Sequence, residues 1–373
     1  MSWKEVGKDV RLDYYPRLVV DLGILRKNMQ EVMARANAMG IQVAGVIKAC
    51  NGLVPVARLF QEVGCRWVAT SRLEQMRHMQ EGGITLPGML IRIPMLTELP
   101  EMVELCEVSL QSDLTVLKAT NEEAGRQGKI HQVILMKDLG DLREGFWEMS
   151  ELIEAAKFVE AAPNLHLLGT GTNLGCYGSV TPTEAKMKEL VEVHRETEKA
   201  VGRKLEVISG ADTTAFPRVL DGTMPSEVNS MRLGEILTIG RDLPILYNTP
   251  TPFLRNDPWH LAAEVVEART KASHPIGELS VDAYGQKPVY EDIGMRRKAL
   301  LAVGRADFAE PFELICRTQG VRVLGASFDH TILDVTDAET PVQVGDILRF
   351  DIRYTGITFA TMGSSIAVEY VGK

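Results

Sequence analysis

Residues 40–60 read GIQVAGVIKACNGLVPVARLF, and this stretch contains the unit that is repeated through most of the chain. It starts with an apolar run typical of a buried strand, and Lys48 stands where that run stops. A turn at Gly52 and the beginning of an amphipathic helix follow. A strand, a turn and a helix in this order indicate one β/α unit with a lysine at the carboxyl end of its strand.

The same alternation recurs through the first 250 residues. Most of the candidate strands are separated by stretches whose apolar residues lie three or four positions apart, which predicts helices. Strands that alternate with helices form a parallel sheet, and eight such units close most simply into a (β/α)8 TIM barrel of the α/β class. The eight apolar runs are residues 42–48, 66–70, 88–93, 108–112, 132–138, 165–171, 205–210 and 230–236.

The pattern changes after about Pro250. Short strand-like runs with little helical period follow, separated by turn residues, and they predict a second, mainly β domain. The proline-rich stretch 247–259 is the expected junction. We therefore expect a barrel domain over residues 1–250 and a C-terminal β domain over residues 251–373.

Composition excludes several classes of protein. The chain has 373 residues and a net charge of −9, which argues against nucleic acid or an anionic membrane as a partner. No apolar stretch is long enough to span a membrane, and residues 1–18 lack the apolar core of a secretory signal. Five widely spaced cysteines without a CxxC pair predict neither a disulfide framework nor a zinc site. A cytoplasmic protein is expected.

The predicted barrel makes Lys48 a candidate active-site residue, because the active sites of such barrels lie at the carboxyl ends of the strands. The lysine is either a rim residue whose ammonium reaches solvent, or an amine with a lowered pKa that forms a Schiff base with an aldehyde. The loops after the last two strands contain small residues that suit a phosphate. A phosphorylated aldehyde indicates pyridoxal 5′-phosphate. The loop residues are Ser209, Gly210 and Ala211 in one loop, and Arg232, Gly234 and Glu235 in the other.

These residues resemble the alanine racemase fold of pyridoxal-phosphate enzymes, the fold-type III group, over nearly the whole chain. The segment VAGVIKACNG is similar to the family's lysine motif, which implies that Lys48 holds the cofactor. ILMKDLGDLREGF resembles the strand with the family's D-x-G-x-x-R pattern, so Arg143 is expected near the cofactor hydroxyl and the substrate carboxylate. NSMRLGEILTIG resembles its arginine-x-glycine segment, so Arg232 is expected at the pyridine nitrogen, with the backbone of Gly234 and Glu235 at the phosphate.

The resemblance extends into the second domain. VDAYGQKP is similar to the segment that holds the family's second catalytic base, here Tyr284. GASFDHTILDVTD resembles the last signature, which implies that Phe328 and Asp329 contact the substrate. Tyr354 falls where the family often has a phosphate-binding tyrosine. The family also implies a head-to-tail homodimer in which Tyr284 reaches the barrel of the partner.

Three positions depart from the alanine racemase pattern. Asn51 stands near the place of a tyrosine, Met136 replaces a lysine that is often carbamylated, and Asn173 matches the histidine under the cofactor ring. Phrases such as MKDLGDLREG, GTNLGCYG and FDHTILDVTD look more like the ornithine racemase branch, also described as alanine/ornithine racemase-like proteins. Ornithine is therefore the first expected substrate, with lysine, alanine and serine after it.

The chemistry can be followed without the family name. Racemisation needs one base to remove the α-proton and an acid on the opposite face to return another. Lys48 can serve one face, and Tyr284 the other if nearby positive charge favours its ionised form. An arginine at position 232 leaves the pyridine nitrogen unprotonated, which favours reprotonation at the α-carbon. Tyr284 could instead be a half-buried structural tyrosine, and Arg232 an ordinary rim arginine in a salt bridge.

Other functions and details stay open on the sequence alone. A metal-assisted D-threonine-type aldolase has a histidine and aspartate pair near its C-terminus, but Asp329 and His330 are adjacent and are expected on opposite faces of a strand. No metal site is therefore predicted. A non-catalytic cofactor carrier would typically lack the β domain. The acidic residues that would suit a cationic substrate are Glu235, Asp282 and Asp329.

Overall fold

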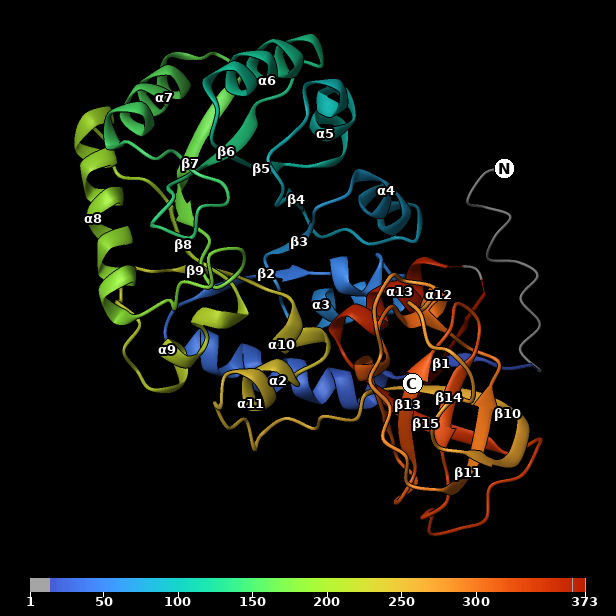
Figure 1. Cartoon of the computed structure of the whole chain (residues 1–373). Helices are drawn as coiled ribbons and strands as arrows, with labels where there is room; N and C mark the ends of the chain where they lie inside the picture. Colours follow the sequence, from blue (N-terminus) through green and yellow to red (C-terminus); the bar gives the residue numbers. More distant parts are fainter. Residues whose placement is uncertain (1–13, 364, 373) are drawn as a thin grey trace. The chain divides into compact units, whose positions relative to one another are not determined.

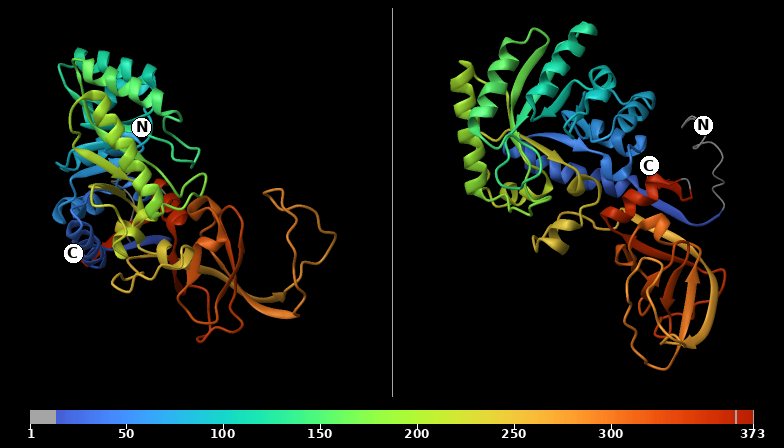
Figure 2. Two further views of the ribbon diagram at one scale, coloured as in Figure 1. Left: turned by 90° about the vertical axis from the view of Figure 1, so that its left-hand side faces the viewer. Right: turned by 45° about the horizontal axis from the view of Figure 1, so that its top comes forward.

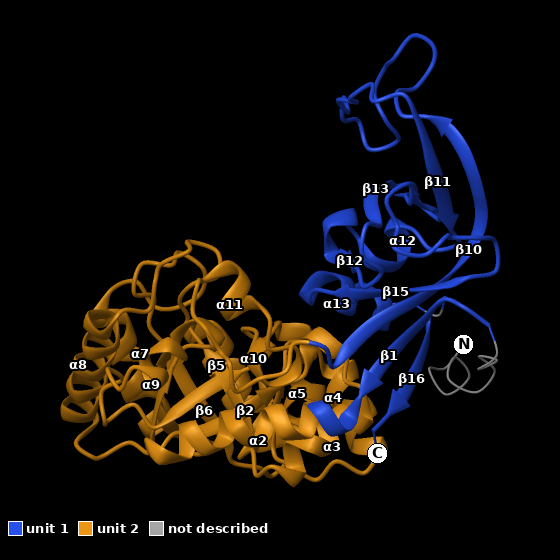
Figure 3. Cartoon of the chain, turned by 90° about the horizontal axis from the view of Figure 1, so that it is seen from below, with its two compact units in different colours: residues 1–24, 257–373 blue, residues 25–256 orange. Residues whose placement is uncertain are grey.

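The computed structural model describes residues 14–363 and 365–372, which form two compact units (Figure 3). One unit spans Leu25–Asn256, and the other joins the chain before Leu25 to the segment from Asp257 onwards. The sequence analysis assigned the whole of residues 1–250 to the barrel domain. In the structure the strand β1 (Arg17–Asp21) instead pairs with strands of the second unit, and the boundary lies at 256/257.

The larger unit is a closed barrel of eight parallel strands in sequence order, with β2 pairing β9 to complete it (Figure 1). All eight predicted strands are confirmed, and so is the fold class. Small and apolar side chains fill the interior, which includes Ala44, Val46, Trp67 and Ile134. The strands are β2 (Gln42–Val46), β3 (Trp67–Thr70), β4 (Gly88–Leu90), β5 (Val108–Gln111), β6 (His131–Met136), β7 (Leu165–Thr172), β8 (Val207–Gly210) and β9 (Ser230–Leu233).

Helices surround the barrel on its outside, as the period of their apolar residues predicts. Local signals set their ends: Asp113 accepts hydrogen bonds from the N–H groups of Thr115 and Val116, and Gly202 ends its helix in the left-handed conformation. The helices are α2 (Leu22–Ala38), α3 (Val54–Glu62), α4 (Leu73–Glu81), α5 (Leu99–Leu105), α6 (Leu114–Arg126), α7 (Met149–Ala161), α8 (Glu184–Val201), and the short α9 (Pro217–Leu220), α10 (Glu235–Thr238) and α11 (Asp242–Leu246).

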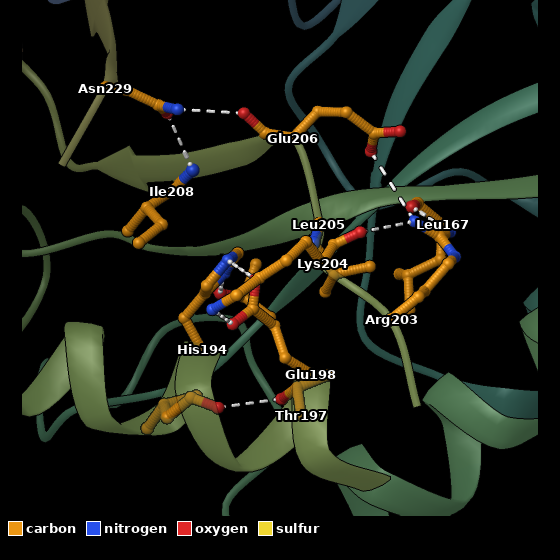
Figure 4. A network of polar contacts seen from close by, with 12 residues as sticks. Leu167, His194, Thr197, Glu198, Arg203, Lys204, Leu205, Glu206, Ile208 and Asn229 are labelled. Carbon is orange, nitrogen blue, oxygen red and sulfur yellow. Dashed lines mark hydrogen bonds and ion pairs between the residues drawn. The ribbon is translucent and has the colours of Figure 1, made fainter. Parts of the chain in front are cut away.

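A buried polar network joins α8 to the barrel wall (Figure 4). His194 shares a hydrogen bond of 2.9 Å between its Nδ1 and the hydroxyl of Thr170 on β7. Glu198, one turn further along α8, accepts hydrogen bonds from the Lys204 ammonium at 2.6 Å and from the Leu205 backbone N–H at 3.0 Å. Because Leu205 leads into β8, this carboxylate connects the helix to the strand that follows it.

We predict that Glu198→Gln destabilises the barrel by about 1–2 kcal/mol at neutral pH. Burial disfavours the charged carboxylate, but the hydrogen bonds from Lys204 and Leu205 outweigh this effect and hold the pKa of Glu198 below its ordinary value. A lowered pKa contributes stability above the ordinary value of about 4.5, and this contribution is lost as pH falls through the folded-state pKa. Chemical unfolding from pH 7 to pH 3 measures the difference.

The control for this prediction is Glu196→Gln, since Glu196 is exposed on the same helix. We expect the control to follow the parent protein at every pH. The gap between parent and Glu198→Gln should narrow below about pH 4.5, where the parent loses the contribution of its ionised carboxylate. A gap that stays constant down to pH 3 would contradict the role of the ionised Glu198.

The second unit is built on a curved sheet that is antiparallel except for one parallel pair, β1 with β16. Its strands run in the order β12-β15-β10-β11-β14-β13, and β1 joins both β10 and β16. The mainly β character of this part of the chain is therefore confirmed. The remaining strands are β10 (Trp259–Ala272), β11 (Met295–Leu301), β12 (Leu314–Cys316), β13 (Arg322–Ala326), β14 (Thr331–Asp334), β15 (Ile347–Ile352) and β16 (Ala367–Val371).

Two features of this unit concern the predicted site. A long loop over residues 273–294 connects β10 to β11 without a helix or strand of its own, and it projects away from the sheet in the left view of Figure 2. The short helix α12 (Arg305–Phe308) packs against α13 (Tyr354–Met362). No described helix of either unit is both long enough and apolar enough to pass through a membrane.

Candidate active site

Lys48 lies just beyond the end of β2, as the first residue of a single 3-10 turn, Lys48–Cys50. Asn51 ends this turn in the left-handed conformation with a φ of 46°, so the chain changes direction directly after the lysine. Burial lowers the pKa of the Lys48 amine below the ordinary lysine value, and the positive charge of Arg143 acts in the same direction. A larger fraction of this amine is therefore neutral near neutral pH than for a lysine on the surface.

The loop between β6 and α7 holds Arg143 in place through two aspartates. Asp138 accepts hydrogen bonds from the N–H groups of Gly140 and Leu142 at 2.8 and 3.2 Å, which fold the loop onto itself. Asp141 is fully buried and accepts three backbone hydrogen bonds of 3.1 Å from the loop between β7 and α8. One carboxylate thus fixes two loops against each other at the carboxyl ends of their strands. The three donors are Gly175, Tyr177 and Val180.

Arg143 itself is held by two partners. Its guanidinium forms a two-pronged ion pair with the neighbouring Glu144, and its Nη1 donates to the Cys176 sulfur at 2.9 Å. Burial disfavours the charge of Arg143, but Glu144 and Cys176 outweigh this effect and raise its pKa further above its ordinary value. The arginine is therefore a permanent cation, and it is close enough to act on the charge of Lys48.

Arg232 is the deepest charged group of the site. It lies on β9 and is almost completely buried. One of its nitrogens donates to the Thr172 carbonyl at 2.7 Å and another to the Ser209 hydroxyl, so its guanidinium spans three neighbouring strands. Burial lowers its pKa to about 10, which still leaves it protonated at neutral pH. Ser209 was expected in a phosphate-binding loop, and its hydroxyl accepts this hydrogen bond from Arg232.

The two loops expected to bind a phosphate meet at their helical turns. Ala211 has a φ of 63°, which turns the chain sharply after β8. The Thr213 hydroxyl accepts a hydrogen bond of 3.3 Å from the N–H of Ile236 at the start of α10, so the two turns lie together. Gly234 lies so close to the strand β2 that an added Cβ would be 3.1 Å from the Cβ of Val46. The two turns therefore lie together beside small residues, which allow a ligand to approach the backbone closely.

Glu235 has a structural task in this region. Its Oε1 accepts hydrogen bonds from the N–H groups of Arg241 and Asp242 at 2.7 and 2.9 Å. Burial and the nearby Asp242 raise the pKa of the Glu235 carboxyl. Its second oxygen is buried without a hydrogen-bond partner. The contact of a phosphate with the main chain at Gly234 and Glu235 stays a prediction.

The barrel residues fit the cofactor that the resemblance implies. Lys48 offers an amine with a lowered pKa, Arg143 and Arg232 offer cations, and the tight turns at Ala211 and Gly234 offer a closely packed backbone. Asn173, directly after β7, is buried, and its Nδ2 has no hydrogen-bond partner. A buried amide that lacks a partner is costly unless a ligand satisfies it. These groups would suit the aldehyde, hydroxyl, ring nitrogen and phosphate of pyridoxal 5′-phosphate.

The second unit brings together the other four predicted residues around α12. The guanidinium of Arg305 lies over the ring of Tyr284, 4.0 Å from its centre. Asp282 fixes the turn around Tyr284, because its carboxylate accepts hydrogen bonds of 2.9 Å from the N–H groups of Tyr284 and Gln286. The backbone of α12 contacts the chain at Phe328, whose carbonyl accepts from Ala306 at 3.0 Å. Asp329 follows directly, and Tyr354 begins the helix that packs on α12.

Two details of the sequence analysis are wrong in this unit. Asp329 and His330 were placed on opposite faces of a strand, but they lie in the turn before β14, and their side chains form a hydrogen bond of 2.8 Å. The alternating residues of 346–354 predict a strand that ends at Tyr354, but Tyr354 is the first residue of α13. Across residues 14–363 and 365–372, no group of three histidine, cysteine, aspartate or glutamate side chains is arranged to hold a metal ion.

Several residues of the site were missed by the sequence analysis. Their side chains bind other residues of the protein, and none of them occupies a position of a known motif. A signal existed for one of them, because the repeated aspartates of DLGD immediately before Arg143 are frequent in loops whose carboxylates bind backbone N–H groups. The missed residues are Asp141, Glu144, Cys176, Thr213 and Arg305.

Comparison with known proteins identifies the class to which this fold and site belong. Residues 20–242 match the family described as "Alanine racemase, N-terminal domain". The chain is 34% identical to an ornithine racemase of Acetoanaerobium sticklandii over 91% of this chain and 95% of that protein. It is 36% identical to a lysine racemase of Thermotoga maritima over 91% of this chain and 94% of that protein. The chain therefore belongs to the alanine racemase family.

Solved structures share the fold. An alanine racemase from a D-cycloserine-producing Streptomyces lavendulae superposes with a TM-score of 0.77 at 21% identity, covering 97% of this chain and 98% of that one. A D-threonine aldolase from Filomicrobium marinum reaches a TM-score of 0.70 at 17% identity, covering 92% of this chain and 89% of that one. At these identities the likeness concerns the fold, which both activities use.

Proposed function

We propose that this protein is a pyridoxal-phosphate-dependent amino-acid racemase that acts on a basic amino acid, with ornithine as the first choice and lysine as the second. The observation on which this rests is the buried Lys48 amine with a lowered pKa, which lies within electrostatic reach of Arg143 at a strand end of the barrel. The names of the two relatives that match over most of the chain support a basic substrate.

When bound, pyridoxal phosphate makes the α-proton of an amino acid acidic. The residues of the chain then have separate tasks. Arg143 binds the α-carboxylate of the substrate, and Lys48, whose lowered pKa increases the neutral fraction of its amine, removes or returns a proton on one face. Tyr284 holds the proton for the opposite face. Arg232, a buried cation, keeps a proton off the ring nitrogen and so favours return of the proton to the α-carbon.

The phosphate is assigned to the paired loops after β8 and β9. Their backbone N–H groups near Ala211, Gly234 and Glu235 supply the donors, and Gly210 allows close packing because an added Cβ would lie 2.5 Å from Val228. The predicted contact of Tyr354 with the same phosphate belongs to this proposal. Asn173, whose amide nitrogen lacks a partner, is assigned to a polar group of the cofactor.

We propose a homodimer in which the loop 273–294 contacts a second copy. Several of its large apolar side chains are exposed, and exposed apolar clusters commonly mark interfaces. A dimer would cover them and would bring Tyr284 to the barrel of the partner. A cytoplasmic location stays a prediction. The exposed apolar residues of the loop and its end are Ile276, Leu279, Val281, Val289, Tyr290 and Ile293.

The deciding experiment uses the purified protein supplied with pyridoxal phosphate. The visible absorbance of the bound cofactor is recorded, and α-proton exchange and inversion are followed in D₂O with L-ornithine, L-lysine, L-alanine and L-serine. Inversion of ornithine or lysine supports the proposal, whereas a preference for alanine or serine would replace the basic substrate. Cleavage of D-threonine to glycine with added Mn²⁺ would instead favour an aldolase, and cofactor binding without any exchange would favour a carrier.

A further inference from the structure

We propose that Glu144 is the residue that selects a cationic side chain, by binding the terminal ammonium of the substrate while Arg143 binds its α-carboxylate. This inference rests on the proposed function and names the part of the site that recognises the substrate class. It begins with the ion pair between these two neighbouring residues, in which both carboxylate oxygens meet the guanidinium.

Glu144 is positioned as a ligand-binding group would be. Only 13% of its side chain is exposed, compared with 32% for Arg143. Its charge acts on Lys48 and on Arg232 as well as on Arg143, so it lies within electrostatic reach of the two deepest cations of the site. Gly145 makes this placement possible, since it has a φ of 136° and lies too close to the backbone of Asp138 for any side chain.

The charge balance of this ion pair changes when a substrate binds. If Arg143 turns to the α-carboxylate, Glu144 loses its partner while most of its side chain stays buried. A buried carboxylate without a partner is destabilising, and this cost opposes the binding of alanine or serine. Ornithine or lysine supplies an ammonium that replaces the guanidinium. The site therefore stays neutralised only with a substrate that has a second positive charge.

The dimensions of the substrate agree with this exchange. The α-carboxylate and the terminal ammonium of extended ornithine are separated by about 6 Å, from ordinary bond lengths. Arg143 and Glu144 are adjacent in the chain and their side chains meet, so the two charged groups must move apart by several ångströms, about the length of the substrate, to hold both ends of one molecule. Chain length would be discriminated weakly, because one methylene changes selectivity by only about 10–200-fold.

The three acidic residues that the sequence suggested for this purpose are engaged elsewhere. Glu235 accepts hydrogen bonds from the backbone at Arg241. Asp282 fixes the turn that carries Tyr284, and Asp329 is paired with His330 at 2.8 Å. Glu144 differs from all three because, within the described residues, its side chain pairs only with the arginine that the substrate itself must engage.

The test compares three amino acids in the parent protein and in Glu144→Gln. Ornithine carries the ammonium, norleucine is its neutral counterpart of equal length, and alanine is small and neutral. We expect kcat/KM for ornithine to fall by about 30–100-fold in Glu144→Gln, mostly through KM, while the values for norleucine and alanine stay the same or rise. Glu144→Asp should recover part of the preference for ornithine. The matched control is Glu148→Gln, an exposed glutamate further along the same loop.

Calorimetry with 2-methylornithine, which has no α-proton, gives a second readout that needs no turnover. We expect its affinity to fall in Glu144→Gln and to be unchanged in Glu148→Gln. An equal loss of kcat/KM for all three amino acids would mean that Glu144 only positions Arg143. Values of kcat/KM that are the same in Glu144→Gln and in the parent would exclude any role of Glu144. Either result overturns the inference. If the parent protein inverts none of the amino acids, the proposed racemase function fails. The binding measurement then tests the role of Glu144 by itself, and equal affinity of the parent and Glu144→Gln for 2-methylornithine overturns that role.

Discussion

Replacing Lys48 with alanine should remove the visible absorbance of the bound cofactor and lower racemisation by at least about 10³-fold. Lys48 is proposed both to attach the cofactor and to move the proton on one face, so a single change removes two functions. The lowered pKa of this amine also predicts the pH dependence of loading. Only the neutral amine attacks an aldehyde, and therefore cofactor uptake by the apoprotein should increase with pH and already be rapid at a pH where ordinary lysines are protonated.

The control for Lys48 is a change that keeps the charge. Lys48→Arg retains a cation but cannot attach the cofactor, so it should be as inactive as Lys48→Ala. Circular dichroism should show both variants folded, because no described hydrogen bond or ion pair depends on the amine of Lys48. Added methylamine should restore part of the proton transfer in Lys48→Ala alone. Normal absorbance and turnover in either variant would refute the assignment of Lys48.

The barrel could be predicted because the residues that specify each strand and helix are close together in the sequence. Each strand is a short apolar run followed by small or turn residues, and each helix has its apolar positions three or four apart, so every unit can be recognised within about 30 residues. The position of Lys48 beyond β2 follows from the same pattern, since the apolar run stops where the strand leaves the interior. The turn at Asn51 required only a residue that tolerates a positive φ.

The parts that could not be predicted depend on distant partners. The strand β1 pairs with β10 and β16, which lie more than 230 residues further along the chain, and nothing within residues 17–21 indicates this. Tyr354 follows a strand of alternating residues, and the helix that starts there has apolar residues all around it, which conceals the helical period. The turn that pairs Asp329 with His330 is set by its fit against α12.

The charged residues of the site could also be predicted only in part, because their positions follow from local sequence but their partners do not. Motif positions such as Arg143 and Arg232 could be named from the sequence, but their partners could not. Asp141 accepts a hydrogen bond from Gly175, 34 residues further on, and Cys176 reaches Arg143 across a similar interval. Glu144 is next to Arg143 in the chain, yet the burial of its side chain follows from the fold of the loop around it. Sequence patterns therefore identify which residues take part, and the fold determines which charges they meet.

Tyr284→Phe is the second change with a large expected effect. We expect racemisation to fall by about 10²–10⁴-fold, because the variant lacks the hydroxyl proposed to move the proton on one face. Proton exchange without inversion should persist for the enantiomer whose α-proton faces Lys48. The phenylalanine ring keeps the contact with Arg305, and the turn keeps its hydrogen bonds to Asp282, so the loop should be unchanged. Exchange measured separately from each pure enantiomer in D₂O tests this asymmetry.

The same loop provides the control. Tyr290→Phe removes a hydroxyl from an equally exposed tyrosine whose ring lies against His274, and it should leave both reactions unchanged. An equal loss of exchange from both enantiomers in Tyr284→Phe would mean that the tyrosine supports binding rather than proton transfer. Unchanged racemisation would remove it from the mechanism and leave the second face to another group.

Mixing the two inactive variants tests whether Tyr284 acts on the partner. In a dimer of one Lys48→Ala chain and one Tyr284→Phe chain, a shared site places the intact lysine of one subunit beside the intact tyrosine of the other. One of the two sites in each mixed dimer is then complete, and random exchange of subunits should restore about a quarter of the parent activity. If each site uses its own Tyr284, every site in the mixture contains one altered residue and no activity returns. The recovered activity therefore distinguishes a site completed by the partner from one contained in a single chain.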